Sequence, residues 1–363
     1  MITLASYSSE WMKSLRGKKG YEKINPQLAE KMIHALALVE LLALNKLDFV
    51  FKGGTSLVLL MEKPGRFSID IDIITEAGRA EIELLLNEII VQKPFSSYQL
   101  NEKRSYQPGV PKAHYSLIYT SEITGKEDHI LLDILFEKHT YPKLLSVPVT
   151  SEWLQTEEPL TYVPVPTLES ITGDKLTAFA PNTTGILYGK GKELEIVKQL
   201  YDLGRLFDLV TDFDVVMDAF TQTVDKEIEY RGKVHNLDNV LEDIVLTAIM
   251  IATRERNTEE PAISNFKEIR TGLLQFKAYQ TSSLFRIDEA IVAAAKAAYM
   301  AALIKTGKKA AFERYEGGMQ KAAHLIDHPD FVMLNKLSAE PLFYMNKVIR
   351  MLYPYEREPV GRT

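Results

Sequence analysis

The spacing of apolar and polar positions changes along the 363-residue chain. Up to about residue 160, short apolar runs that alternate with polar residues lie between stretches with helical spacing, whereas beyond it the spacing is helical throughout. The first half is expected to hold strands at 48–51, 68–74, 114–119 and 129–136, and helices at 27–44, 56–61 and 81–90. This pattern predicts an α+β fold with a mixed sheet.

The second half is expected to be all-α. A proline-rich stretch at 159–166 is interpreted as a connector between two domains, 1–160 and 161–363. Apolar residues then recur every three to four positions, which predicts helices at 168–179, 193–209, 213–224, 240–253, 288–305 and 341–352.

Composition excludes several kinds of chemistry. The chain contains no cysteine, which rules out disulfides, thiolate catalysis and cysteine-based zinc sites. Its start lacks a basic segment followed by an apolar core, and no apolar stretch reaches the length of a membrane span, so we expect a cytoplasmic protein. The net charge of −6 argues against a wholly basic nucleic-acid clamp but leaves room for a local basic face.

Two carboxylates one residue apart are the first candidates for chemistry. On a strand, Asp70 and Asp72 point to the same side, while the isoleucines between and beside them point into a core. Their mutual repulsion favours a bound cation, and hard oxygen ligands suit magnesium, or manganese in its place. Asp133, inside the apolar run 129–136, is a candidate third metal ligand.

A glycine turn precedes these aspartates. Gly53 and Gly54 allow close approach of a ligand to the backbone, and a helix that begins at Ser56 would present free N–H groups to phosphate, with the Thr55 and Ser56 hydroxyls beside them. Each signal alone has an ordinary explanation: a solvated strand face for the aspartates, and a capped helix start for the turn. Their combination, in the order strand, turn, helix and acidic strand, favours binding of a nucleotide.

This combination resembles the first motif of the DNA-polymerase-β-like nucleotidyltransferase superfamily, and within it the AbiEii-type, MenT-like toxins. The sequence Arg66-Phe67-Ser68 before Asp70 is also characteristic of AbiEii relatives. The resemblance covers roughly residues 45–210. It implies a nucleotidyltransferase-fold domain in which Gly53, Gly54, Thr55, Ser56, Arg66 and Ser68 contact the nucleotide and Asp70 and Asp72 are catalytic.

The resemblance extends to two later helices. It implies that Lys175 binds the triphosphate and acts in catalysis, and that Asp202 is also catalytic. The residues themselves allow other interpretations: Lys175 could pair at the surface with Glu169 or Asp174, and Lys198 and Asp202 could form an exposed i, i+4 ion pair. Where the family often has Arg-Asp or Lys-Asp before the Tyr-Asp-Leu sequence, this chain has Ile196-Val197-Lys198.

The function implied is magnesium-dependent transfer of a nucleotide from an NTP to an acceptor hydroxyl. The resemblance suggests a toxin–antitoxin toxin of the abortive-infection type that modifies the 3′ end of tRNA to block translation, with a cognate antitoxin as partner. The helical domain is then expected to complete the active-site cleft and contribute to substrate or partner binding. Alternatives are a transferase that acts on a small molecule or a protein, and a catalytically silent nucleotide-binding module.

Three further groups of residues are considered. Lys190 and Lys192 lie in a glycine-rich loop that is either solvated or able to touch an RNA backbone. His324 and His328 are metal-capable, but a structural or surface role is favoured. The densest basic region of the helical half has two interleaved aromatic residues, and it is either a nucleic-acid grip or a solvated face; it comprises Lys305, Lys308, Lys309, Phe312, Arg314, Tyr315 and Lys321.

Overall fold

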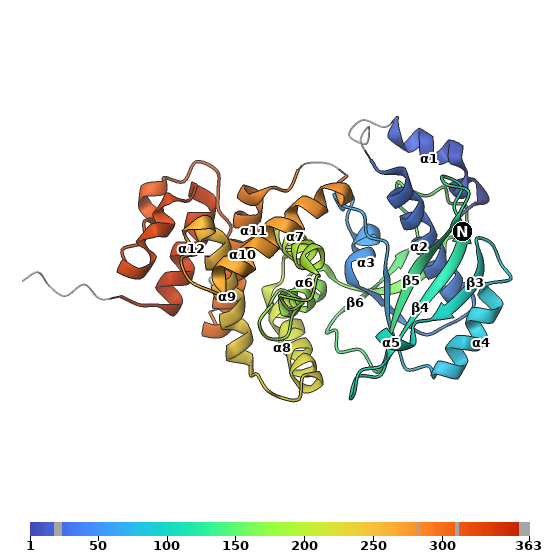
Figure 1. Ribbon diagram of the computed structural model, residues 1–363, viewed down its shortest axis with the longest axis horizontal. Helices are drawn as coiled ribbons and strands as arrows, with labels where there is room; N and C mark the ends of the chain where they lie inside the picture. Colours follow the sequence, from blue (N-terminus) through green and yellow to red (C-terminus); the bar gives the residue numbers. More distant parts are fainter. Residues whose placement is uncertain (18–23, 282–283, 309–311, 356–363) are drawn as a thin grey trace, which may run out of the picture. The chain divides into compact units, whose positions relative to one another are not determined.

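The computed structural model describes residues 1–17, 24–281, 284–308 and 312–355, and the chain divides into two units. The first unit comprises Met1–Ile171 together with Lys277–Leu284. The second comprises Thr172–Phe276 and Phe285–Thr363. The two units are described one at a time (Figure 1).

A five-stranded mixed sheet in the order β1-β2-β5-β4-β3 forms the centre of the first unit, and β6 and β7 form a separate ribbon. β2 and β5 are parallel, and the other neighbouring strands are antiparallel. The strands are β1 Val50–Lys52, β2 Ile71–Thr75, β3 Phe95–Leu100, β4 Lys112–Thr120, β5 Glu127–Phe136, β6 Leu144–Pro148 and β7 Tyr162–Pro166. The helices are η1 Leu4–Tyr7, α1 Ser9–Arg16, α2 Pro26–Leu44, α3 Gly53–Leu60, α4 Arg79–Ile89, α5 Glu102–Ser105 and η3 Lys277–Tyr279.

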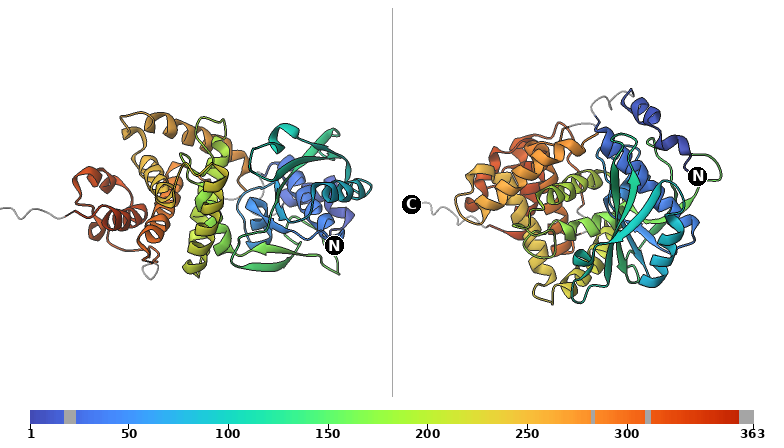
Figure 2. Two further views of the ribbon diagram at one scale, coloured as in Figure 1. Left: turned by 90° about the horizontal axis from the view of Figure 1, so that it is seen from below. Right: turned by 45° about the vertical axis from the view of Figure 1, so that its right-hand side comes forward.

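One face of the five-stranded sheet is covered by α2 and α4 (Figures 1 and 2). Two strand side chains of this face make the contacts: the ring of Tyr119 on β4 stacks on His34 of α2 at 3.8 Å, and the hydroxyl of Tyr115 donates to Glu83 of α4. Ile71 and Leu132 are fully buried in the same layer. The alternation of a strand therefore places Asp72 and Asp133 on the opposite face.

The expected helix at 27–44 is confirmed as α2. Its start is capped, because the side-chain oxygen of Asn25 accepts hydrogen bonds from the N–H groups of Gln27 and Leu28, and Pro26 occupies the first turn, where no N–H is needed. Nearly every side chain from Ala29 to Leu42 is buried, which includes the carboxylates of Glu30 and Glu40. Both carboxylates accept hydrogen bonds inside the unit, which makes their burial tolerable.

Three local predictions are wrong. The acidic strand expected at 68–74 is β2, which begins only at Ile71, so Asp70 lies just before the strand. The helix expected to start at Ser56 begins at Gly53, because the strand before it already ends at Lys52. The proline-rich stretch taken as a connector contains β7, which pairs with β6. Proline is compatible with this strand because the two-stranded ribbon leaves one edge of β7 without ladder hydrogen bonds, while Val163 and Val165 are fully buried.

The segment 277–281 returns from the helical half of the sequence to the first unit. Its main chain bridges the residues just before β2: the N–H of Phe67 donates to the carbonyl of Tyr279 at 2.7 Å, and the N–H of Thr281 donates to the carbonyl of Gly65 at 3.0 Å. Arg66 and Gln280 are partners in an isolated antiparallel bridge. We call residues 277–281 the return strap.

The second unit is all-helical in the ranges that the structure describes. α11 packs against α7, α9 and α12, and its alanine-rich sequence allows close approach, since Gly204 of α7 lies directly against Ala293. No helix in these ranges, α11 included, is long and apolar enough to span a membrane. The helices are α6 Leu168–Ala178, which begins in the first unit, α7 Glu193–Leu209, α8 Phe213–Tyr230, α9 Leu237–Thr253, η2 Arg254–Arg256, α10 Ala262–Phe276, α11 Ile287–Thr306, η5 Lys321–His324, η6 Pro329–Lys336 and α12 Ala339–Leu352.

Candidate active site

Four polar residues form a row across the face of the sheet that is opposite to α2 and α4. In the strand register, Lys52 of β1 lies opposite Asp72 of β2, Asp72 lies opposite Asp133 of β5, and Asp133 lies opposite His114 of β4. Directly opposed residues on neighbouring strands share a face and lie close enough to interact. The sheet therefore brings the second aspartate of the predicted pair beside the carboxylate predicted on a later strand.

The carboxylate of Asp133 contacts an imidazole and a guanidinium group. Its Oδ1 lies 2.5 Å from Nδ1 of His114, and its Oδ2 lies 3.3 Å from a guanidinium nitrogen of Arg104. Sequence reasoning missed both partners. His114 opens the run 114–119, which was correctly predicted as a strand, but a strand prediction carries no register, so its position opposite Asp133 was not evident.

Asp72 lies on β2 and Asp70 directly before it, and both residues are half-buried. Within the described ranges no three side chains of histidine, aspartate or glutamate are arranged as a ready-made metal site, and this includes the predicted ligand set of Asp70, Asp72 and Asp133. Magnesium does not need such a set, because it keeps several waters and is commonly held by one or two carboxylates together with substrate phosphates. Asp70 and Asp72 fit that form of binding, and the assignment of all three ligands stays a prediction.

The glycine turn packs against the aspartate strand. Gly53 has a φ of +77°, and a Cβ added there would overlap the carboxylate of Asp72. A Cβ on Gly54 would overlap the guanidinium of Arg66 and come within 3.0 Å of the Ser68 hydroxyl. Both glycines are therefore required by close approach, and at Gly53 the backbone conformation adds a second reason.

Three predicted hydroxyl groups stabilise this turn from within. Thr55 Oγ1 hydrogen-bonds with Ser68 Oγ at 2.8 Å and with the carbonyl of Asp70 at 2.5 Å. Ser56 Oγ donates to the carbonyl of Gly53 at 2.8 Å. Thr55 and Ser56 are completely buried, so these contacts fix the turn against the strand, and a direct contact of either hydroxyl with a nucleotide stays a prediction.

Arg66 is buried beside the turn. Its guanidinium lies against Gly54 and donates to the carbonyl of Phe67 at 2.9 Å, and the residue is only 4% exposed. The return strap pairs with the main chain on both sides of it. The first unit thus brings together the glycine turn, Arg66, Ser68 and both aspartates.

In the second unit, the structure brings Lys175 and Asp202 together. Lys175 Nζ on α6 lies 2.7 Å from Asp202 Oδ2 on α7 and donates to Gln199 Oε1 at 3.0 Å. Both side chains of the ion pair are buried, which overturns the surface interpretation of Lys175 and the exposed-pair interpretation of Asp202. A buried ammonium held by a carboxylate and an amide oxygen is a rigid positive charge.

The remaining candidates have different surroundings. Lys190 and Lys192 are exposed in their loop, where Glu268 accepts from the N–H of Gly189. Four described basic residues of the basic region are exposed, namely Lys305, Lys308, Arg314 and Lys321, and both predicted roles stay predictions. Arg314 also donates to the carbonyl of Phe207 and packs on the ring of Phe312, itself stacked on Phe213. Lys309 of that region lies outside the described residues.

The two histidines have structural contacts, as the sequence favoured. The ring of His324 packs edge-on against Phe343, and His328 Nδ1 accepts from the N–H of Asp330. No three metal-capable side chains of the described chain surround either of them.

The glycine turn, the acidic strand and the mixed sheet define a nucleotidyltransferase. Residues 36–305 match the family described as nucleotidyl transferase AbiEii toxin, Type IV toxin–antitoxin system. The match spans well over half of the chain, and the chain therefore belongs to this family of transferases.

Comparisons with individual proteins give weaker likenesses. Two solved structures are JHP933 from Helicobacter pylori, with 15% identity, a TM-score of 0.42 and coverage of 79% of this chain and 97% of the other, and an antigenic nucleotidyltransferase-like protein from Paracoccidioides brasiliensis, with 14% identity, a TM-score of 0.35 and coverage of 59% and 93%. No curated protein sequence shows significant similarity to this chain.

Proposed function

We propose that this protein transfers a nucleotide from an NTP to the 3′-terminal hydroxyl of a tRNA in the cytoplasm, with magnesium, and so acts as a toxin that blocks translation. The observation that carries the transfer chemistry is the contact between the glycine turn and Asp72, with Asp133 in register beside it. Support for tRNA as the acceptor, and for a cognate antitoxin, comes from membership of the family and its toxin–antitoxin description.

The glycine turn and the start of α3 are assigned to the triphosphate. The first N–H groups of a helix lack partners within the helix and favour an anion, and glycines allow phosphate oxygens to come close to them. Arg66, buried against Gly54, places a second positive group at the same turn. A triphosphate bound there would lie next to Asp72.

Asp70 and Asp72 are assigned to the metal that accompanies the triphosphate. Their oxygens are the ligand type that magnesium prefers, and phosphate oxygens would complete the coordination. Bound in this way, magnesium would supply neutralisation of the charge on the triphosphate and on the departing pyrophosphate.

His114 and Asp133 are assigned to the proton of the acceptor hydroxyl. Asp133 accepts from Nδ1 of the imidazole, which leaves Nε2 available as a base, the arrangement in which a carboxylate fixes the tautomer of a catalytic histidine. The hydroxyl oxygen then forms a bond to the α-phosphorus while its proton passes to Nε2. The bond from the α-phosphorus to the bridging oxygen breaks, and pyrophosphate leaves with the electron pair.

The Lys175–Asp202 pair is assigned to the triphosphate as well. A compact ammonium serves as a point charge for phosphate, and the short contact with Asp202 sets where that charge lies. In this role Asp202 is a positioning residue, which acts through Lys175.

The test is a transfer assay with α-labelled ATP, CTP, GTP and UTP, each incubated with the protein, magnesium chloride and total tRNA. Label is expected on tRNA with at least one NTP and not with the Asp72→Ala variant. Label on a protein or a small molecule, with tRNA unlabelled, would show that this molecule is the acceptor and tRNA is not. No transfer above the variant with any NTP or acceptor fraction would reject the function.

A further inference from the structure

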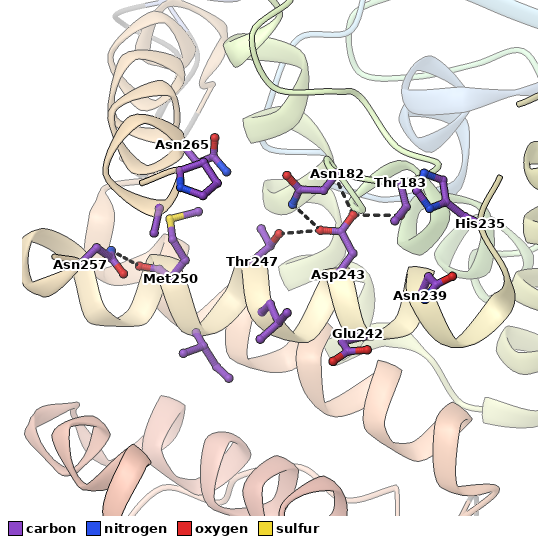
Figure 3. A pocket seen from close by; sticks show the side chains of 14 residues that line it. Asn182, Thr183, His235, Asn239, Glu242, Asp243, Thr247, Met250, Asn257 and Asn265 are labelled. Carbon is purple, nitrogen blue, oxygen red and sulfur yellow. Dashed lines mark hydrogen bonds between the residues drawn. The ribbon is translucent and has the colours of Figure 1, made fainter. Parts of the chain in front are cut away.

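The helical unit contains a cavity of about 680 Å³ whose residues take no part in the proposed transfer. It lies along α9, between that helix, the turn at Asn182 and Thr183, and the start of α10 (Figure 3). Cavities of this size are typical of sites that enclose small organic molecules.

One wall of the cavity is fixed by the carboxylate of Asp243. This buried group accepts from the main-chain N–H and the side-chain amide of Asn182, at 2.8 and 2.6 Å, and from the hydroxyls of Thr183 and Thr247, at 2.9 and 3.3 Å. Four donors occupy the acceptor positions of this one carboxylate. Asp243 therefore fixes the positions of its neighbours and has no acceptor position left for a ligand. The orientation of Asn182 is therefore set before any ligand arrives.

Several polar groups around the cavity remain available. Within the described ranges, the side chains of His235 and Asn265 have no hydrogen-bond partner. Asn182 donates its amide to Asp243 and keeps its side-chain oxygen as an acceptor, while Asn239 accepts from Asn236 and keeps its side-chain N–H groups as donors. Figure 3 shows Asn265 and Asn182 on either side of the same space. The cavity thus offers both donors and acceptors.

The lining also has an apolar part. Ile249, Met250 and Pro261 contribute aliphatic, thioether and ring surfaces, and Leu246 is half exposed at the rim. Apolar walls with a few well-placed amides are the usual composition of a pocket for a planar organic ligand.

The charge of the lining selects against phosphate. None of the lining residues that the structure describes is a lysine or an arginine, and two of them, Glu242 and Asp243, are acidic. A phosphate group in the cavity would meet negative charge without a cation to balance it. This separates the cavity from the site assigned to the triphosphate.

We propose that this cavity binds an uncharged heteroaromatic with an exocyclic amino group, of the nucleoside class, either as a free nucleoside or as an unpaired base of an RNA. An asparagine amide pairs with the adjacent donor and acceptor on the edge of such a ring, as in contacts with adenine. Met250 and Pro261 provide surfaces for the faces of the ring. The proposal does not depend on the transfer activity.

The test uses saturation-transfer NMR on the full chain with adenosine, cytidine, AMP and ATP, and fluorescence anisotropy with a short labelled single-stranded adenine-rich RNA. The binding measurements are made on the Asp72→Asn background, so that the triphosphate site contributes least. Asn265→Leu removes the free amide with little change of volume. Asn87→Leu, an equally simple change at an exposed position on α4, is the matched control.

Adenosine is expected to bind the Asn87→Leu protein as it binds the parent, and at least tenfold more weakly to Asn265→Leu, with AMP and ATP weaker than adenosine. Leu246→Arg, at the half-exposed rim, should reverse the preference toward AMP. Binding of RNA alone that requires Asn265 would assign the base to RNA. Absence of both kinds of binding, insensitivity to Asn265→Leu, or a preference for ATP in the parent would each overturn the proposal.

Discussion

The ammonium nitrogen of Lys175 lies 2.7 Å from a carboxylate oxygen of Asp202, and the two side chains are 6% and 3% exposed. Helices α6 and α7 each contribute one partner, and Gln199 adds a second acceptor to the ammonium. An ion pair with so little solvent contact is costly to leave half-made, because the remaining charge is desolvated without compensation. Stability and transfer activity should therefore both depend on Asp202.

Replacing Asp202 by asparagine is expected to lower the free energy of unfolding by about 3 kcal/mol, measured by urea denaturation. The double variant Lys175→Met/Asp202→Leu removes both charges and should recover most of that loss. It should nevertheless transfer no nucleotide, since the positive charge assigned to the triphosphate is gone. Transfer activity in the double variant would show that the pair has a structural role alone.

Substitution of Gly53 by alanine is expected to abolish transfer with only a moderate loss of stability. A positive φ costs an L-residue about 1–2 kcal/mol, and the new Cβ would push the Asp72 carboxylate away from the turn. Gly109 has the same φ of +77° and open space around it, so Gly109→Ala carries the backbone cost alone. Equal transfer activity of Gly53→Ala and Gly109→Ala would show that the position of the Asp72 carboxylate does not affect the reaction.

His114→Gln is expected to slow transfer by about 10²- to 10⁴-fold, the usual contribution of a general base. The loss should appear in kcat with little change in KM for the NTP. Steady-state rates over a range of NTP concentrations measure both. An unchanged kcat would remove His114 from the proton transfer and leave Asp133 as the candidate.

A buried histidine makes stability depend on pH. Burial lowers the pKa of His34 to about 4, against the packing of Tyr119, Tyr7 and Phe95 around the ring. The ordinary pKa is about 6.5, so as pH falls the unfolded chain takes up the proton first. The free energy of unfolding therefore decreases between about pH 6.5 and pH 4, by about 3 kcal/mol from this group.

Urea denaturation of His34→Phe across that range should give a shallower decrease than in the parent. Glu30, the pKa of which burial raises, is present in both proteins and cancels in the comparison. His129→Phe, at an exposed position on β5, provides the control. Identical pH slopes for the parent and His34→Phe would mean that folding leaves the pKa of His34 at its ordinary value.

Periodicity was enough for β1, β2, β4 and β5 and for most long helices, because the isoleucines beside Asp72 and the apolar run around Asp133 have the spacing of buried strands. It did not predict β3 and β6, whose exposed positions break the apolar pattern. It could not supply register, which depends on contacts between distant segments, and so the pairing of Asp133 with His114 was missed. The strand β7 was missed because its two prolines resemble a connector. The contact between Lys175 and Asp202 was also inaccessible, since the packing of two helices decides it.

The return strap determines when the segment around Arg66 can complete its hydrogen bonds during synthesis of the chain. A chain emerges from its N-terminus, and domains generally begin to fold as they appear, at roughly 5–20 residues per second. The main-chain partners of Gly65 and Phe67 are Thr281 and Tyr279, which are made after most of the helical unit. The segment that carries Arg66 therefore cannot complete its main-chain pairing until residue 281 has been synthesised. In a fragment that ends at Ile171, the Gly65 carbonyl and the Phe67 N–H would lack these two partners.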